Sequence, residues 1–283
     1  MAPTTETGID VGAPPPGPLT AVEEWPVDAA AAAVVDRTGI IHAVGDLDRP
    51  FALASVTKPL FASAVLVAIE EGSLALEEPA GPEGSTIEHL LAHASGLGLD
   101  GRELAAPGRR RIYSNAGFEV LGAELERTTG LTPATYLAEA VLAPLAMTAT
   151  GLDGSPAHAA VSTVADLARW VGELIDPRLL ARTTVARATS VAFPGLDGLV
   201  PGYGKQAPND WGLGFEVRGA KDPHWTSPAN SSATVGHFGR SGTFWWFDPA
   251  VELALIVLTD REFEAWCKPR WPALADTVLA SRG

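Results

Sequence analysis

Residues 51–72 read FALASVTKPLFASAVLVAIEEG and form the most apolar stretch of the chain. The pattern predicts a helix over residues 55–71, because its apolar residues recur at helical spacing and Gly72 is a residue type that often ends helices. Its longest uncharged part, residues 60–69, is too short to cross a bilayer. We therefore expect no membrane span here, and Lys58 is the one charged residue between positions 51 and 69.

Ser55 and Lys58 form the motif S-x-x-K at the start of this helix. Positions i and i+3 lie on the same helical face, so the lysine amine can reach the serine hydroxyl. A serine hydroxyl is a weak nucleophile until a base accepts its proton, and partial burial lowers the pKa of a lysine toward that task. A serine at a helix start also aims its own backbone N–H outward, as one half of an oxyanion hole.

The same four residues are equally compatible with a lysine that runs from the helix start to water. The chain has only four lysines, so one inside its most apolar helix is unexpected. Pro59 lacks a helix donor and biases Lys58 away from helical geometry. A regular helix is therefore compatible with Pro59 only if Ser55 lies in its first turn.

The composition limits the classes of function. The chain has 283 residues, of which 46% are hydrophobic and 19% charged, so disorder and coiled coil are poor descriptions. Its net charge of −14 argues against a nucleic-acid partner and against an anionic membrane surface. The single cysteine, Cys267, cannot form an internal disulfide. No basic residue precedes an apolar core at the N-terminus, so we predict no signal peptide and expect a cytoplasmic protein.

Strand patterns lie at the two ends of the chain and helix patterns in the middle. Pro, Gly and Thr dominate residues 1–18, which predicts a flexible leader. Residues 190–210, rich in Gly and Pro, predict a long loop. The predicted strands are residues 29–35, 40–44, 211–217, 237–247 and 252–259, and the further predicted helices are residues 86–93, 115–129, 132–142, 163–175 and 271–280.

This order predicts an α+β fold in which both chain ends build one antiparallel β-sheet flanked by helices. The predicted sheet domain comprises residues 19–60 and 205–283, and residues 61–204 form an inserted, mainly helical domain. We find no internal repeat at a fixed period.

A second polar motif, Tyr113-Ser114-Asn115, stands directly before a predicted helix. A tyrosine near a lysine ammonium ionises more easily and can relay protons, whereas an asparagine can hold a substrate carbonyl or amide and orient the lysine. In the alternative interpretation, Tyr113 packs a loop and Asn115 caps the helix.

A third motif, His237-Phe238-Gly239, opens a predicted strand and is followed by Arg240. A glycine in a strand lets a ligand approach the backbone closely, and the next N–H can complete an oxyanion hole. The alternative is an edge strand with a surface histidine.

In this order, the three motifs resemble those of the serine β-lactamase and penicillin-binding protein superfamily, whose signatures are S-x-x-K, S-D-N and K-T-G. The sequence is most similar to the class C β-lactamase-like branch, in which Y-x-N replaces S-D-N and H-x-G can replace K-T-G. That branch includes esterases, D-amino-acid peptidases, carboxypeptidases and β-lactamases. Further segments, such as HLLAHASGL at residues 89–97, extend the resemblance over about residues 30–260.

The resemblance implies a β-lactamase/transpeptidase-like fold and a reaction that passes through an acyl-enzyme. Ser55 would be the acylated nucleophile, Lys58 its partner base, and Tyr113 the proton relay to the leaving group. No cofactor and no metal are implied, and the partner would be a small-molecule ester, amide or peptide substrate. We find no glutamate motif of the class A deacylating type, so fast β-lactam turnover is not expected.

The resemblance assigns substrate binding to Asn115, His237, Gly239 and Arg240. Asn115 would position the substrate amide or ester, and the backbone N–H of Arg240 would join that of Ser55 in the oxyanion hole. Two departures concern the third motif. Phe238 stands where a hydroxyl usually helps bind a carboxylate, and His237 is neutral or only partly charged at pH 7. Both favour a neutral ester or amide over a penicillin or an acidic-tailed peptide.

Four other patterns are weaker. His89 and His93 would share a helical face as a zinc pair, but no third ligand is evident and structural packing is the favoured interpretation. Residues 96–101 fit G-x-G-x-x-G but follow a helix, which disfavours a dinucleotide site. The arginines of residues 109–111 could steer a substrate carboxylate, although a solvated face or pairing with local acidic residues is the favoured interpretation. Trp245 and Trp246 should alternate across a strand, one ring inward and one outward.

Two hypotheses remain. The first is a serine hydrolase that acts on a small ester or amide through an acyl-enzyme on Ser55. The second is a non-catalytic binding or sensing module that keeps the cleft, motivated by the altered third motif. Neither the natural substrate nor the oligomeric state follows from the sequence.

Overall fold

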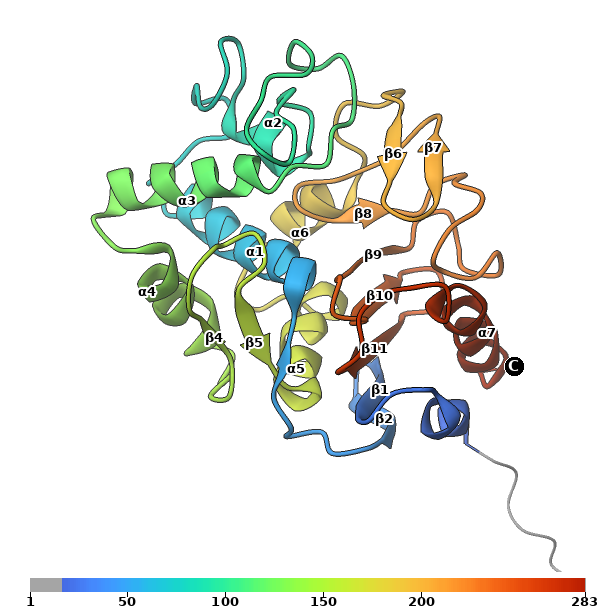
Figure 1. The fold of residues 1–283 in the computed structure, drawn as a ribbon. Helices are drawn as coiled ribbons and strands as arrows, with labels where there is room; N and C mark the ends of the chain where they lie inside the picture. The colour runs from blue at the N-terminus through green and yellow to red at the C-terminus, as the bar shows by residue number, and fades with distance from the viewer. Residues whose placement is uncertain (1–16, 283) are drawn as a thin grey trace, which may run out of the picture.

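The computed structural model describes residues 17–282, and the two ends of that part of the chain lie side by side in one sheet (Figure 1). The six strands pair antiparallel in the order β2-β1-β11-β10-β9-β8. Their bounds are β1 Ala30–Asp36, β2 Gly39–Val44, β8 Glu216–Val217, β9 Val235–Phe238, β10 Phe244–Asp248 and β11 Leu253–Thr259. The predicted α+β fold is therefore confirmed. The predicted leader lies outside the described residues, apart from its last two positions.

Both faces of this sheet are covered. Strands β10 and β11 are buried at every position. One face packs against α5 (Val164–Ile175) and the other against α7 (Cys267–Ala280). Trp245 and Trp246 consequently point to opposite faces and are both fully buried, in two separate clusters of apolar side chains. The prediction of one outward-facing ring is wrong, because α7 covers the second face.

The middle of the chain is mainly helical, as predicted, and its helices begin and end at recognisable signals. Thr86, Thr132 and Thr163 each accept a hydrogen bond from the backbone N–H three residues later. Gly130 ends a helix in the left-handed conformation, with φ of 73°. The helices here are α1 Thr57–Glu70, α2 Ile87–Leu91, α3 Ala116–Thr129, α4 Pro133–Leu137, the π-helical turn Ala138–Leu142, α5, and α6 Arg182–Thr189.

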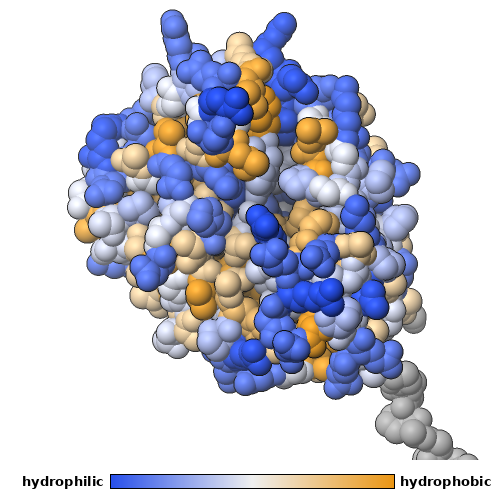
Figure 2. Space-filling model, in the orientation of Figure 1, coloured by the Kyte–Doolittle hydropathy of each residue, from blue (hydrophilic) through white to orange (hydrophobic). Residues whose placement is uncertain are grey.

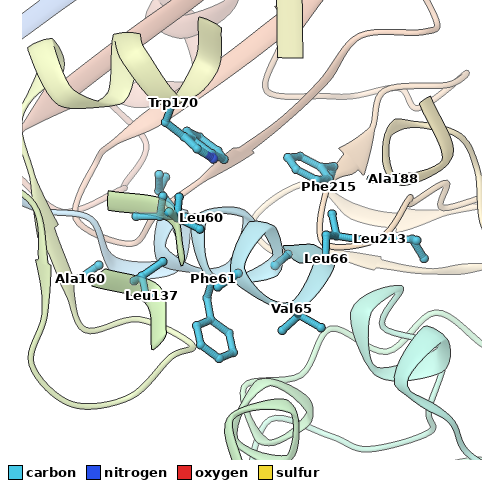
Figure 3. Packing of buried hydrophobic residues seen from close by; sticks show 14 of the residues in the cluster. Leu60, Phe61, Val65, Leu66, Leu137, Ala160, Trp170, Ala188, Leu213 and Phe215 are labelled. Carbon is cyan, nitrogen blue, oxygen red and sulfur yellow. The ribbon is translucent and has the colours of Figure 1, made fainter. Parts of the chain in front are cut away.

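Helix α1 lies at the centre of the molecule, and its residues from Thr57 to Ala68 are buried. Figure 3 shows Leu60 and Phe61 of this helix among side chains from several other elements, with Phe215 on the side of Leu66. Trp170 lies over the first half of the helix and donates a hydrogen bond from Nε1 to Ser63 Oγ. A helix that is apolar all round needs such an enclosed position. Burying one side chain of this size stabilises a fold by roughly 1.5–3 kcal/mol.

Several predicted boundaries need correction. The predicted loop 190–210 contains the hairpin β6 (Gly198–Val200) and β7 (Gly204–Gln206). The predicted strand 237–247 is two strands, β9 and β10, joined by a tight turn in which Gly242 has a φ of 77°. The predicted strand 211–217 shrinks to β8. No sequence pattern was strong enough to predict two further features. One is a small sheet of β3 (Phe51–Ala52), β5 (Ala160–Ser162) and β4 (Gly151–Leu152), and the other is the helix α6.

One face of the molecule is largely hydrophilic. On the face drawn in Figure 2, hydrophilic residues predominate and hydrophobic residues form small separate groups. Within residues 17–282, none of the helices has both the length and the apolar character that a bilayer crossing requires.

Candidate active site

Ser55 lies in a single 3-10 turn, Ala54–Val56, that leads directly into α1. Ala54 has a φ of 46°, which is uncommon for a residue with a Cβ, so the chain bends sharply just before the serine. Pro59 is the third residue of α1, where a backbone N–H would lack an intrahelical acceptor in any case. The sequence condition for a helix here, Ser55 at its very start, is therefore met.

The side chain of Lys58 is fully buried directly behind the serine. Its Nζ lies 3.4 Å from Ser55 Oγ, and it donates hydrogen bonds to Asn115 Oδ1 at 2.6 Å and to the Ala157 carbonyl oxygen at 2.9 Å. Burial lowers the pKa of Lys58 to about 7, and the carboxylate of Glu119 opposes this shift only in part. The interpretation of a lysine that reaches water is wrong, and the amine has the pKa of a base that can act near neutrality.

Tyr113 and Asn115 flank the lysine on the side of α3. Lys58 Nζ lies 4.7 Å from the centre of the Tyr113 ring. Asn115 occupies the N-cap position of α3 but makes no side-chain capping bond, because its amide oxygen binds Lys58. Desolvation raises the pKa of Tyr113, and a hydrogen bond with Ser55 opposes this only in part. The expectation that Tyr113 ionises more easily is therefore wrong, and the phenol keeps its proton.

His237 lies in β9 and faces the same site. Its ring centre is 5.8 Å from that of Tyr113 and 5.5 Å from that of Trp211. Its Nδ1 lies 2.7 Å from the Phe238 carbonyl oxygen. Burial lowers the pKa of His237 to about 4, with the nearby Lys58 as a second cause, so the ring is neutral at pH 7. The interpretation of a surface histidine is wrong.

Gly239 and Arg240 follow on the turn after β9. A Cβ at Gly239 would lie 2.3 Å from the Leu53 carbonyl oxygen and 2.6 Å from Thr243 Oγ1. The glycine is therefore needed so that this turn can pack against the turn that carries Ser55. The side chain of Arg240 is largely exposed and lies 3.6 Å from a carboxylate oxygen of Glu262.

Of the seven site residues expected from the sequence, all except Lys58 and Gly239 line one open cleft of about 410 Å³. Ser55 and Asn115 bring polar groups to it, and Phe238 contributes an aromatic wall at the position where the sequence lacks a hydroxyl. The lining residues are Ser55, Leu99, Tyr113, Asn115, Pro201, Gly202, Trp211, Glu216, His237, Phe238, Arg240 and Phe263. The three sequence motifs thus meet at one place, as expected.

Glu216 is a cleft residue that the sequence motifs do not reveal. Its carboxylate accepts a hydrogen bond from Trp225 Nε1 at 2.9 Å and lies 3.2 Å from His224 Nε2 and 3.4 Å from Lys221 Nζ. Burial alone would raise the pKa of Glu216, but the charge of Lys221 and these hydrogen bonds hold it well below its usual range. The carboxylate of Glu216 therefore stays ionised in the cleft wall, with Lys221 beside it as the counter-charge.

Two residues set aside in the sequence have structural roles behind the cleft. Arg111 is buried, and its guanidinium donates to four backbone carbonyl oxygens, so the view of residues 109–111 as a solvated face is wrong for Arg111. His93 follows α2 with a φ of 54°, accepts a hydrogen bond from the Ser114 N–H and packs 4.7 Å from the Tyr113 ring. It does not share a helical face with His89. In residues 17–282, no three His, Cys, Asp or Glu side chains are grouped as a metal would need.

Comparisons with known proteins identify the family to which the sequence is similar. The sequence profile of the Beta-lactamase family matches residues 26–279. Esterase EstB of Burkholderia gladioli is 28% identical to the chain over 82% of its length and 83% of the esterase. Penicillin-binding protein 4* of Bacillus subtilis is 28% identical over 35% of the chain and 30% of that protein.

Solved structures with the same fold include the following two. A crystal structure described as a beta-lactamase from Mycobacterium bovis is 54% identical, with a TM-score of 0.92 over 93% of this chain and 98% of that chain. EstCE1, described as a hydrolase with promiscuous acyltransferase activity, has a TM-score of 0.73 over 91% of this chain and 95% of that chain. At 19% identity, the likeness to EstCE1 concerns the fold alone.

Proposed function

The chain belongs to the Beta-lactamase family, and we propose that it is a serine hydrolase that forms an acyl-enzyme on Ser55 and acts on a small neutral ester or amide. The observation that carries this proposal is the pair of Ser55 Oγ and Lys58 Nζ, 3.4 Å apart, in which burial lowers the pKa of the lysine to about 7. A serine needs such a base within reach before it can attack a carbonyl carbon.

In the acylation step, neutral Lys58 accepts the proton of Ser55 as Oγ bonds to the substrate carbonyl carbon. The carbonyl oxygen takes the negative charge, and the backbone N–H groups of Ser55 and Arg240 stabilise it. Within residues 17–282, the Arg240 N–H has no backbone acceptor of its own, which supports this role.

The tetrahedral intermediate then collapses, and the bond from the carbonyl carbon to the leaving oxygen or nitrogen breaks. Tyr113, which keeps its proton because desolvation raises its pKa, donates that proton to the leaving group and recovers one from Lys58. Asn115 holds Lys58 in place through its amide oxygen. Attack by water on the acyl-enzyme, with proton transfer to the same groups, releases the acid and restores Ser55.

The preference for a neutral substrate rests on the third motif. A lysine in the third motif would place a positive charge beside a substrate carboxylate. Here burial keeps the ring of His237 neutral, and Phe238 has an aromatic side chain instead of a hydroxyl. Apolar residues, among them Trp211 and Phe263, supply much of the cleft wall. The relative EstB is an esterase, which supports ester hydrolysis as the first reaction to test.

A β-lactam is the second candidate substrate class, because the 54% identical relative from Mycobacterium bovis is described as a beta-lactamase. Hydrolysis of a chromogenic cephalosporin in steady state would support it. One acylation per molecule without further turnover would instead make β-lactams inhibitors of the esterase site.

The direct test is turnover of 4-nitrophenyl butyrate by the wild type, by Ser55→Ala and by Ser73→Ala, a matched serine variant outside the cleft. We expect the wild type and Ser73→Ala to turn the ester over at similar rates and Ser55→Ala to lose nearly all activity. Equal activity of Ser55→Ala and the wild type would disprove the nucleophile. If a panel of esters and amides stabilised the wild type thermally but was never hydrolysed, the non-catalytic binding module would be the better description.

A further inference from the structure

The oxyanion hole proposed above would be built from two turns that lie far apart in the sequence. The Ser55 N–H belongs to the turn Ala54–Val56, and the Arg240 N–H belongs to the turn that joins β9 to β10. Two backbone donors stabilise one oxyanion only if both are held at the right distance and direction. The contacts between the two turns therefore decide how well such a hole is formed.

The side chain of Thr243 joins these two turns. Its hydroxyl donates a hydrogen bond to the Leu53 carbonyl oxygen at 2.9 Å. The same oxygen accepts the Val56 N–H at 3.2 Å, which closes the turn that carries the serine. The carbonyl oxygen of Thr243 in turn accepts the Gly239 N–H at 2.8 Å, which closes the other turn. One residue thus connects the closing hydrogen bonds of both turns.

The hydrogen bond of the Thr243 hydroxyl is shielded from water. The side chain of Thr243 is fully buried. A Cβ at Gly239 would lie 2.3 Å from the Leu53 carbonyl oxygen and 2.6 Å from Thr243 Oγ1, so the two turns are in direct contact here. A water molecule therefore has no room to replace the hydroxyl, and its removal would leave the Leu53 carbonyl without this donor.

The backbone just before Ser55 depends on this contact. Ala54 has a φ of 46°, a conformation that residues with a Cβ rarely adopt. Such a conformation persists only where surrounding contacts maintain it. The preceding residue, Leu53, is held from two sides, because its carbonyl oxygen accepts from Thr243 and its N–H donates to the Ala160 carbonyl oxygen at 2.9 Å.

The other connections of the turn after β9 are weaker or do not depend on a side chain. The Ser241 hydroxyl donates to the Ala52 carbonyl oxygen at 2.7 Å, but this bond lies at the surface, where water can take its place. The Phe263 N–H donates to the Arg240 carbonyl oxygen at 2.7 Å through the backbone alone. Thr243 is therefore the buried side chain on which the fit of the two turns rests.

On the basis of the function proposed above, we infer that Thr243 is a positioning residue for the oxyanion hole, whose hydroxyl holds the turn of Ser55 against the turn of Arg240. Thr243 does not line the cleft, so it acts through the two N–H groups and not on the substrate directly. These donors matter most in the transition states, where the substrate oxygen is negatively charged. Acylation and deacylation both pass through such an oxyanion, so loss of the hydroxyl should lower kcat at nearly constant KM.

The variant Thr243→Val tests the inference, because valine has nearly the same shape and lacks the hydroxyl. With 4-nitrophenyl butyrate, we expect kcat to fall on the order of tenfold or more. Phenylboronic acid forms a tetrahedral adduct with a nucleophilic serine and places an oxygen where the oxyanion would lie, so its Kd should rise by a similar factor. Thr243→Ser restores a hydroxyl and should recover most of both losses.

Three further variants separate positioning from stability. Thr163→Val removes another buried threonine hydroxyl, the cap of α5 outside the cleft, and should lower the melting temperature but keep kcat and the boronic acid Kd. Ser241→Ala removes the connection at the surface and should have a smaller effect than Thr243→Val. Should Thr243→Val fail to fold, Thr243→Cys keeps a weak donor in its place and should give losses between those of the wild type and a variant without a donor.

The outcomes distinguish this inference from the proposed function. Unchanged kcat and boronic acid Kd in Thr243→Val, in an enzyme that Ser55→Ala inactivates, would leave the serine hydrolase intact and overturn the role of Thr243. Equal losses in Thr243→Val and Thr243→Ser, or a change confined to KM, would overturn it as well. If the wild type hydrolyses no ester, the boronic acid Kd of wild type and variants still decides. Absence of both turnover and boronic acid binding would contradict the proposed function, and this inference with it.

Discussion

Two charged groups are buried at the cleft, and their surroundings differ: Lys58 lies behind Ser55, in what we call the first wall, and Glu216 lines what we call the second wall. The amine of Lys58 has only neutral acceptors as hydrogen-bond partners, namely Ser55, Asn115 and the Ala157 carbonyl. The carboxylate of Glu216 has a lysine, a histidine and an indole N–H around it. Burial therefore lowers the pKa of Lys58 to about 7, whereas Glu216 stays ionised.

The comparison shows that burial affects a charged group with a counter-charge differently from one without. A buried charge without a counter-charge exchanges its proton easily, which is what a general base must do. A buried charge with a counter-charge and hydrogen-bond donors keeps its state over a wide pH range. The first wall can thus take part in proton transfer, whereas the ion pair of the second wall has a structural role.

The largest expected effect concerns the first wall. Lys58→Met keeps the length of the side chain but removes the base, so kcat should fall by about 10³-fold or more, while the circular dichroism spectrum stays that of the wild type. Lys205→Met, which changes an exposed lysine, serves as the matched control. A Lys58→Met enzyme within tenfold of the wild type would exclude lysine as the base.

Stability tests the second wall. Lys221→Met removes the cation beside Glu216 and should lower the free energy of unfolding by about 3 kcal/mol or more, because a buried carboxylate is left without its counter-charge. The double variant Glu216→Gln/Lys221→Met should recover part of this loss. Urea unfolding measures both values, and a single variant as stable as the wild type would refute the account of this ion pair.

The proton donor gives a smaller effect that depends on the substrate. Tyr113→Phe should lower kcat by about 10²-fold for an alkyl ester or an anilide, whose leaving groups need a proton. For a 4-nitrophenyl ester, the leaving phenolate is stable without one, and the loss should be much smaller. An equal loss for both substrates would point to a packing role for Tyr113 instead of proton transfer.

The pH profile gives the smallest effect. Since the acylating form needs neutral Lys58, with a pKa of about 7, kcat/KM should rise as pH increases through about 7. Glu119 raises the pKa of Lys58, so Glu119→Gln should lower that pKa and shift the acid limb to lower pH. The shift should be only about a few tenths of a pH unit, because the carboxylate is exposed. A shift to higher pH would contradict the assignment.

The sequence predicts more of the first wall of the site than of the second. The residues of the first wall stand in short motifs, because Ser55 and Lys58 are three positions apart and Tyr113 and Asn115 two, and local spacing gave these positions directly. Glu216 and its partners lie in a segment of short strands and turns without periodicity, and only tertiary packing brings them to His237.

The dependence on tertiary packing also explains why the sequence predicts some other features of the fold and not the rest. Helix α1 and strand β11 were easy to predict because each is a largely continuous apolar run, and such a run indicates a buried element without knowledge of its neighbours. Arg111 is buried because four carbonyl oxygens from distant segments converge on it, and no local pattern signals such a site. The role of Gly239 likewise depends on contact with Leu53, far away in the sequence. The domain boundaries and the cytoplasmic location stay predictions.

The central claim is that Ser55 carries the acyl group, and intact-protein mass spectrometry during turnover tests it most directly. The wild type, quenched in acid during hydrolysis of 4-nitrophenyl butyrate, should gain the mass of one butyryl group, and peptide mapping should place it on Ser55. Ser55→Ala should gain none. Steady turnover with no adduct, or an adduct that maps to another residue and persists in Ser55→Ala, would contradict the account.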